Sequence, residues 1–252
     1  MRTLDIHTDD MLYVEKGGEI IPKITGVDLD ARQPGSTAVE FVSHCPACGA
    51  PLVRVEGEAA WVCPDRWHCP PQIIGRIEHF VGRHMMDIDG IGEETAAALY
   101  AAGLVRNIAD LYDLTVERLM TLEGFGQRSA ERVVDGLRAS LAVPFERVLY
   151  ALSIPFVGET TAKRIARQVR SVDRLMEMDR TALMGIEDVG PRIADSIIDY
   201  FAVDTNRATV ERLRLAGVQL ALPEEETAGH TDRLGGKSFV ISGVFQLNSR
   251  ER

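Results

Sequence analysis

The chain has 252 residues, of which 45% are apolar and 26% are charged, a balance typical of globular proteins and not of disordered segments. No run of about 18 apolar residues is present, which excludes a membrane-spanning helix. The first residues also lack the hydrophobic core of a secretory signal, so we expect a cytoplasmic protein. The formal net charge of −10 excludes a uniformly basic surface, but local patches and oriented backbone amides can still bind nucleic acid.

The first 40 residues have the pattern of a β-hairpin followed by a connector. Apolar residues at 11–14 and 20–24 flank Gly17 and Gly18, which predicts two short strands joined by a tight turn. A lone hairpin is only marginally stable in water. We therefore expect this segment to be the end of a larger β-domain.

All the cysteines lie close together in the sequence, with the spacing Cys-x2-Cys-x14-Cys-x5-Cys. A Cys-x2-Cys pair on a tight turn presents two thiolates to one ion, and a second pair that returns after a short hairpin completes a tetrahedral site. Gly49 follows the first pair, where such turns often need a left-handed residue. We predict one structural Zn²⁺ ion with no open position for water, bound by Cys45, Cys48, Cys63 and Cys69.

Other interpretations of this segment remain open. The cysteines could be free buried thiols or form two disulfides, although a cytoplasmic chain favours metal. His44 and His68 flank the cysteines and could replace a thiolate, and Trp61 and Trp67 suit packing over the zinc core better than stacking on bases. A segment of about 30 residues is too short to fold on apolar burial alone, so we expect its fold to require the metal.

The region after residue 77 is helical in pattern and contains a fourfold repeat. Four segments with the pattern h-x-Gly-h-Gly, or a close variant, align without gaps, and their last glycines recur every 32–34 residues. Alanine follows four residues later and an aliphatic residue seven later, which places both on one face of a helix. The segments are residues 88–92, 122–126, 154–158 and 186–190; the alanines are Ala96, Ala130, Ala162 and Ala194; the aliphatic residues are Leu99, Val133, Ile165 and Ile197.

These repeats resemble the helix-hairpin-helix motif. Such a hairpin exposes backbone amides at the N-terminus of its second helix, where the amides and the helix dipole suit a phosphate oxygen. Glycine lets the phosphate come close, and the contact reads the backbone without reading the base sequence. A helical interaction protein with ordinary turns, which binds no DNA, is the alternative interpretation.

The four hairpins differ in their suitability for DNA. Glu93 and Glu94 follow the first and would repel phosphate, whereas Pro191 removes one amide from the fourth. Phe156 and Asp188 replace the first glycine of the motif in the third and fourth hairpins. We expect the second and third to contact DNA most strongly and the first to be mainly structural. The candidate DNA-binding residues are Gly90, Gly92, Gly124, Gly126, Arg128, Gly158, Lys163, Arg164, Gly190 and Arg192.

The last 30 residues indicate a linker and the start of another domain. Residues 223–236 are acidic and contain turn-forming residues, as linkers do. Residues 237–243 have the pattern of a first strand. Both ends of the sequence look interrupted, so we expect the chain to be part of a longer protein.

In this order, the motifs resemble the C-terminal half of the bacterial NAD-dependent DNA ligases. Residues 15–22 resemble the stretch that closes the OB-fold of the family, and the cysteine spacing matches its zinc finger. Residues 79–92 and 145–159 match its helix-hairpin-helix domain, and residues 236–243 match the opening of its BRCT domain. The resemblance implies a mainly α fold with these parts: 1–40, the C-terminal part of an OB-fold; 41–76, a four-cysteine zinc finger; 77–222, a helix-hairpin-helix domain of four repeats; 223–236, a linker; 237–252, a truncated BRCT start.

The resemblance also implies that the whole protein seals nicks in duplex DNA during replication and repair. In the family, the lysine of a Lys-x-Asp-Gly motif takes AMP from NAD, a step that needs an amine nucleophile. None of Lys16, Lys23, Lys163 and Lys237 is followed by x-Asp-Gly. We therefore expect no catalytic residue in this chain, and NAD and Mg²⁺ only through domains outside it.

The expected partner is nicked double-stranded DNA, bound by a monomer without sequence preference and in association with the bacterial nucleoid. The alternative is a stand-alone zinc and helix-hairpin-helix module that binds DNA but has no ligase activity.

Overall fold

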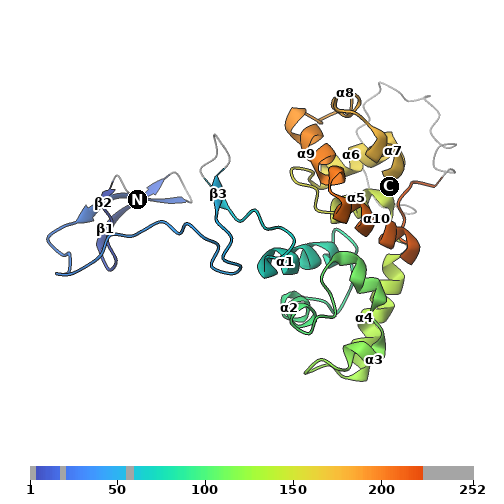
Figure 1. Ribbon diagram of the computed structural model, residues 1–252, viewed down its shortest axis with the longest axis horizontal. Helices are drawn as coiled ribbons and strands as arrows, with labels where there is room; N and C mark the ends of the chain where they lie inside the picture. Colours follow the sequence, from blue (N-terminus) through green and yellow to red (C-terminus); the bar gives the residue numbers. More distant parts are fainter. Residues whose placement is uncertain (1–3, 18–20, 55–59, 224–252) are drawn as a thin grey trace, which may run out of the picture. The chain divides into compact units, whose positions relative to one another are not determined.

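The computed structural model describes residues 4–17, 21–54 and 60–223. Apart from Pro223, the expected linker and BRCT start lie outside the described residues. The chain divides at Pro70 into two compact units, of which the first is built from strands and loops and the second from helices (Figure 1). The expectation of a mainly α fold is confirmed. Within the described part of the chain, no helix is long and apolar enough to cross a membrane.

The first unit contains the predicted β-hairpin. Strands β1 (Met11–Gly17) and β2 (Ile21–Asp28) pair antiparallel. Their register shifts after the Tyr13–Gly26 pair, which leaves Thr25 as a bulge. Four apolar side chains of this hairpin have large exposed fractions, from 56% to 72%, which is typical of a surface that packs against a partner. These side chains are Met11, Tyr13, Val14 and Ile21.

The second unit consists of two similar sets of helices followed by one further helix. Helical structure begins at Pro70, before residue 77, where the sequence placed the start of this domain. The first set comprises α1 (Pro70–Val81), α2 (Glu93–Ala101), the 3₁₀ helix η2 (Ile108–Asp113), α3 (Val116–Leu119) and α4 (Gln127–Ser140). The second comprises α5 (Phe145–Ala151), α6 (Glu159–Val169), α7 (Val172–Glu177), α8 (Arg180–Met184) and α9 (Pro191–Ala202).

The repeated apolar positions form the core of this helical unit. The side chains of Ala96, Ala130, Ala162 and Ala194 are all 0% exposed. The aliphatic residues one turn later are at most 1% exposed. The predicted common face is therefore confirmed: small alanines let each helix approach its neighbours, and the aliphatic side chains fill the space beside them.

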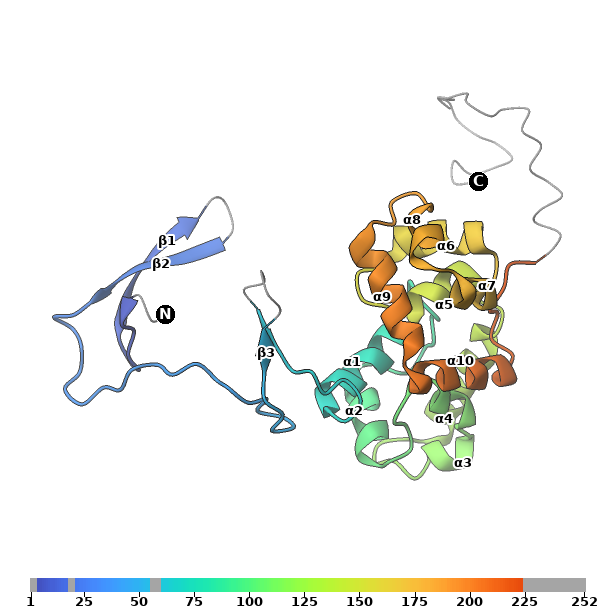
Figure 2. The ribbon, with the colours of Figure 1, turned by 45° about the horizontal axis from the view of Figure 1, so that its top comes forward.

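Helix α10 (Asp204–Ala216) connects the two sets (Figure 2). Arg212 donates to Asp110 of η2 at 2.6 Å, and Arg214 donates to Asp173 of α7 at 2.6 Å. Partly exposed ion pairs of this kind contribute about 1 kcal/mol or less each. Burial of apolar side chains such as Leu213, which is 0% exposed, contributes about 1.5–3 kcal/mol each and so does more to hold α10 in place.

Replacing Ala130 by leucine should lower the free energy of unfolding of the helical unit by about 1–3 kcal/mol, because a larger side chain overpacks a filled site. Urea unfolding followed by circular dichroism measures this. The matched control is Ala139→Leu on the exposed face of the same helix, which should leave stability within about 0.5 kcal/mol. Equal losses in the two variants would contradict the packing role of the repeated alanines.

Candidate metal centre and nucleic-acid interface

The four cysteine sulfurs lie together. All four Sγ atoms are within 4.8 Å of one another, with Cys45 and Cys69 at 3.9 Å and Cys48 and Cys63 at 3.5 Å. A tetrahedral zinc site with Zn–S bonds of about 2.3 Å places its sulfurs about 3.8 Å apart. A disulfide needs about 2.05 Å. The cluster therefore fits zinc, and the alternative of two disulfides is wrong because all four cysteines are free.

The backbone around the first cysteine pair forms the expected tight turn. The N–H of Gly49 donates to the carbonyl of Cys45, and the N–H of Cys45 donates to the carbonyl of Ala50, both at 2.8 Å. Gly49 has φ +74°, so the left-handed residue predicted there is confirmed. The strands β3 (Val53–Arg54) and β4 (Trp61–Val62) then return the chain to the second pair.

The environment of the cluster tunes its thiols. Hydrogen bonds from the backbone N–H groups of Ala47 and Cys48 lower the pKa of the Cys45 thiol to about 7, which favours the thiolate. Burial raises the pKa of Cys63. A zinc ion when bound stabilises all four thiolates and compensates for burying their charge.

The histidines beside the cysteines are engaged elsewhere. The exposed His68 lies 2.8 Å from Asp65, and Nδ1 of His44 lies 3.0 Å from the hydroxyl of Ser43. In the described residues, the metal-ligand cluster contains cysteines alone. Trp61 is 44% exposed, and its ring centroid lies 5.3 Å from that of Phe41, so it packs on the segment before the first cysteine pair.

Removing zinc with a chelator should unfold the cysteine segment, because its short strands bury little apolar surface. Limited proteolysis should then cut within residues 41–69, while the helical unit, which has its own core, remains protected.

Lowering the pH should release the metal as the thiolates take up protons. Unchanged protease resistance of this segment after complete zinc removal would contradict the assignment.

All four hairpins share one backbone conformation. The residue two positions before each last glycine is left-handed, with φ between +62° and +88°, including the two positions where the motif lacks glycine. The turn is therefore retained in hairpins three and four, although a side chain in this region is strained. These residues are Gly90, Gly124, Phe156 and Asp188.

The last glycine of each hairpin caps a helix without a side chain. These four residues have φ between −105° and −81°, which any residue adopts, and an added Cβ would meet nothing within 4 Å. Neither backbone strain nor packing inside the described chain requires glycine there. Four other helices begin with polar caps whose side chains accept helix N–H groups: Asn107, Thr115, Ser171 and Asp179.

This contrast has a physical meaning. A polar N-cap stabilises a helix by about 1 kcal/mol relative to alanine, and it occupies an N–H group of the first turn. The hairpin helices lack such a cap at Gly92, Gly126, Gly158 and Gly190. In α2, α4 and α6 the amides of the first three residues have no partner within the helix, so they can donate to an external anion. In α9 the N–H of Ile193 donates to the carbonyl of Gly190 at 3.1 Å and Pro191 has no N–H, which leaves fewer amides.

The first hairpin has an internal role. A Cβ on Gly90 would lie 2.8 Å from the side chain of Val133 in α4, so glycine is needed there for packing as well as for its φ. The equivalent Gly124 has open space around it. Glu93 and Glu94 occupy the first turn after the first hairpin. These features are consistent with the structural role expected for this hairpin.

The second hairpin presents an available cation. Arg128 is exposed and, among the residues that the structure describes, forms no ion pair. Ser129, which was not among the residues predicted to bind DNA, accepts a hydrogen bond from the N–H of Gly126 at 3.0 Å and donates to its carbonyl at 2.8 Å. The position of this serine, three residues after the last glycine of the hairpin, is the sequence feature from which the interaction could have been predicted. Its hydroxyl fixes the backbone at the start of α4.

The cations of the third hairpin are paired with acids. Lys163 and Arg167 approach the carboxylate of Glu146 at 3.8 Å and 3.6 Å. Arg164 forms an ion pair with Asp188 of the fourth hairpin. The sequence predicted that Arg164 contacts DNA. In the structure its charge is offset by Asp188 on the neighbouring hairpin.

The third and fourth hairpins contact each other in both directions. The Arg164–Asp188 pair joins α6 to the fourth hairpin. The hydroxyl of Ser196 in α9 donates to the carbonyl of Pro155 in the third at 2.7 Å. These reciprocal contacts hold the two glycine-capped helix starts in a fixed relation.

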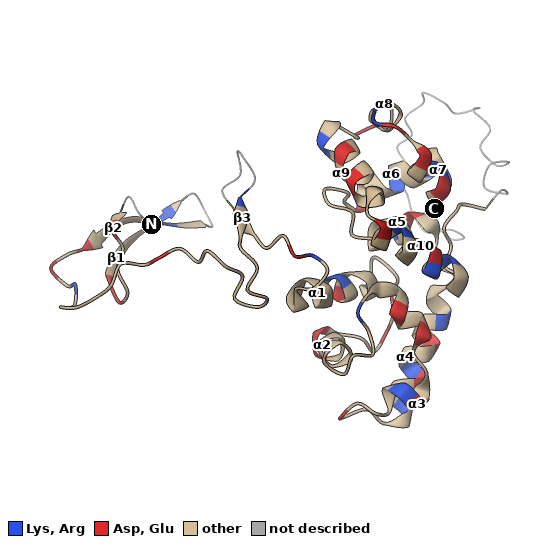
Figure 3. Ribbon diagram, viewed as in Figure 1, with Lys and Arg blue, Asp and Glu red and all other residues tan. Residues whose placement is uncertain are grey.

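Charge is mixed over the helices. Arginines are interspersed with Asp and Glu along α4 and α10, and α9 carries one arginine and two aspartates, so these helices form no basic face (Figure 3). Binding of an anion to this unit therefore depends on local groups, in particular helix N-termini and single cations, more than on the overall field.

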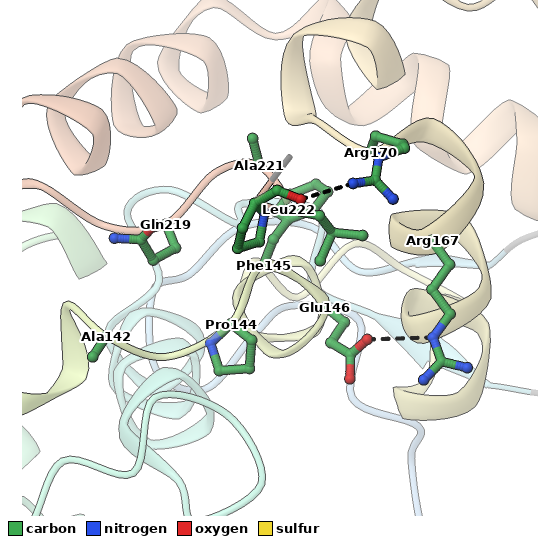
Figure 4. A pocket seen from close by; sticks show the side chains of 10 residues that line it. Ala142, Pro144, Phe145, Glu146, Arg167, Arg170, Gln219, Ala221 and Leu222 are labelled. Atoms are coloured by element: carbon green, nitrogen blue, oxygen red, sulfur yellow. Dashed lines mark hydrogen bonds and ion pairs between the residues drawn. The ribbon is translucent and has the colours of Figure 1, made fainter. Parts of the chain in front are cut away.

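A hollow of about 980 Å³ lies beside α5 and the end of α6 (Figure 4). Glu146 and Arg167 pair across one side of it, and Arg170 donates to the carbonyl of Pro223 at 3.0 Å. Because Arg167 is paired with Glu146 and Arg170 is bonded to a backbone carbonyl, the hollow offers less to an anionic ligand than the uncapped helices do.

Comparisons with protein families agree with this geometry. Residues 44–70 match the NAD-dependent DNA ligase C4 zinc finger domain. Residues 82–139 match a SAM-like helix-hairpin-helix tandem, and residues 147–210 match a helix-hairpin-helix motif. The fold and the cysteine cluster thus define a zinc finger and tandem helix-hairpin-helix domains.

Comparisons with single proteins lead to one family. The chain is 53% identical over 248 residues to a DNA ligase of Phocaeicola vulgatus and 52% identical to one of Bacteroides fragilis. Each match covers 98% of this chain and 37% of the relative. A DNA ligase of Cytophaga hutchinsonii is 47% identical over all 252 residues, which cover 38% of its length.

The chain thus spans a little over a third of the length of the curated relatives that it matches. Over that region the resemblance to the NAD-dependent DNA ligases is confirmed, and the chain is similar to a part of such a ligase that includes its zinc finger domain. The zinc finger match and the cysteine cluster together support a structural zinc.

Proposed function

We propose that this chain grips the phosphate backbone of nicked duplex DNA, without sequence preference, as part of an NAD-dependent DNA ligase. The observation that carries the proposal is the set of four helices that begin at uncapped, sterically open glycines. Four other helices of the same unit have polar caps. Glycine takes the N-cap position in the helices that follow the four hairpins, and this favours an external anion as the partner of their free amides.

The second hairpin is the main phosphate site in this proposal. The amides of the first turn of α4 donate to one phosphate, and Arg128 adds a charge that no acid in the described residues offsets. The third hairpin contributes the amides after Gly158. The other candidate residues contribute less. Gly90 and Gly124 shape their turns, and Lys163 and Arg164 approach acids. Glu93 and Glu94 follow Gly92, Pro191 removes an amide after Gly190, and Arg192 lies over the ring of Phe156.

The four cysteines bind the proposed zinc ion, which holds the short segment before the helical unit in one conformation. In the same proposal, residues 1–40 are the end of an OB-fold and residues 237–252 the start of a BRCT domain. The chain acts as a monomer in the bacterial cytoplasm.

The activity of the whole protein is proposed from its relatives. Their name, DNA ligase, supports nick sealing in replication and repair. Because none of the four lysines here is followed by x-Asp-Gly, the adenylated lysine, NAD and Mg²⁺ belong to other parts of that protein. The chain alone should therefore bind nicked DNA without sealing it.

Gly126→Val should weaken binding to duplexes of unrelated sequence by the same factor, roughly tenfold, because a branched side chain blocks phosphate approach to the amides of α4. Fluorescence anisotropy with nicked and intact duplexes measures this. Gly75→Val is the matched control, since Gly75 also has open space around it but lies in the middle of α1. Unchanged affinity of Gly126→Val would refute the role of the second hairpin.

Arg128→Ala should reduce the slope of log affinity against log salt by about one, because one fewer counterion is released. The affinities are measured over a range of salt concentrations with one duplex. Arg138→Ala, at the other end of the same helix, is the control and should leave the slope as it is. Salt-independent binding of the unchanged chain would contradict phosphate contact altogether.

A further inference from the structure

Phe156, at the tip of the third hairpin, has a combination of properties that the fold does not require. It occupies the left-handed position of the turn, with φ +65°, and its side chain is 55% exposed. A bulky side chain in this region is uncommon and strained. The equivalent residue of the first and second hairpins is glycine, which adopts the same conformation without strain.

The fourth hairpin also replaces this glycine, but there the side chain has an internal partner. Asp188 forms an ion pair with Arg164, which joins the two hairpins. Phe156 contacts the guanidinium of Arg192 on one face of its ring, and it is still 55% exposed. Strain and exposure at one residue favour a contact with something outside the chain.

The surroundings of the ring limit what it can contact. The guanidinium of Arg192 lies 3.8 Å from the ring centroid and covers one face. With one face covered, the ring is not placed to insert between two bases, since that uses both faces. Gly158 lies two residues after Phe156, and the amides that follow it begin at Glu159.

We propose that Phe156 packs against a deoxyribose of the duplex, next to the phosphate that binds the amides of α6. A sugar is the apolar part of the backbone beside every phosphate, so an aromatic ring beside a phosphate site suits it. This contact is independent of base sequence and adds affinity that salt does not screen. The inference rests on the proposed DNA-binding function and extends it to a residue absent from the candidates drawn from the sequence.

The test uses the full chain and a nicked duplex. Phe156→Gly should lower the affinity about five- to tenfold while the slope of log affinity against log salt stays as steep as in the unchanged chain. The thermal midpoint should not fall, since glycine relieves the backbone strain. Phe156→Leu keeps an apolar side chain and should retain affinity within about twofold.

Two results would overturn the inference. One is unchanged affinity of Phe156→Gly. The other is a joint loss of affinity and thermal stability in both variants, which indicates a purely structural residue. A failure of the proposed function is recognised separately: the unchanged chain then shows no salt-dependent binding. If Gly126→Val weakens binding and Phe156→Gly does not, only the deoxyribose contact is refuted.

Discussion

The helical unit depends on one backbone constraint, a left-handed residue two positions before a glycine in extended conformation. This pair of conformations turns the chain sharply and starts a new helix with no side chain over its first amides. Gly124 adopts the left-handed conformation without strain, whereas Phe156 and Asp188 adopt it as side-chain-bearing residues. All four hairpins retain the turn despite these substitutions. The feature that the repeats share is therefore the geometry of the helix start.

In the proposed function, the same constraint lets an acidic chain bind DNA. The formal net charge is −10, and several cations near the hairpins are paired with carboxylates, as Lys163 and Arg167 are with Glu146. Partial charges at helix N-termini do not depend on the net charge and act at short range. In this proposal the amides supply the phosphate contact and Arg128 supplies local charge.

Local patterns were predictable from the sequence, and long-range pairs were not. The Cys-x2-Cys pair with Gly49 predicted a metal turn, and the spacing of glycine, alanine and aliphatic residues predicted the core faces, because both follow from backbone periodicity. The Arg212–Asp110 pair joins residues 102 positions apart, which no local pattern records. The same holds for Arg164, whose partner Asp188 lies in the next repeat, so its charge looked available in the sequence.

The central claim is that the uncapped amides of the second and third hairpins bind phosphate. Amide chemical shifts of the full chain, measured by NMR during titration with a nicked duplex, test it most directly. We expect the largest shifts at residues 127–129 and 159–161, with smaller shifts at the polar-capped helix that follows Ser171. Shifts of equal size at both kinds of helix start, or none at the hairpins, would contradict it.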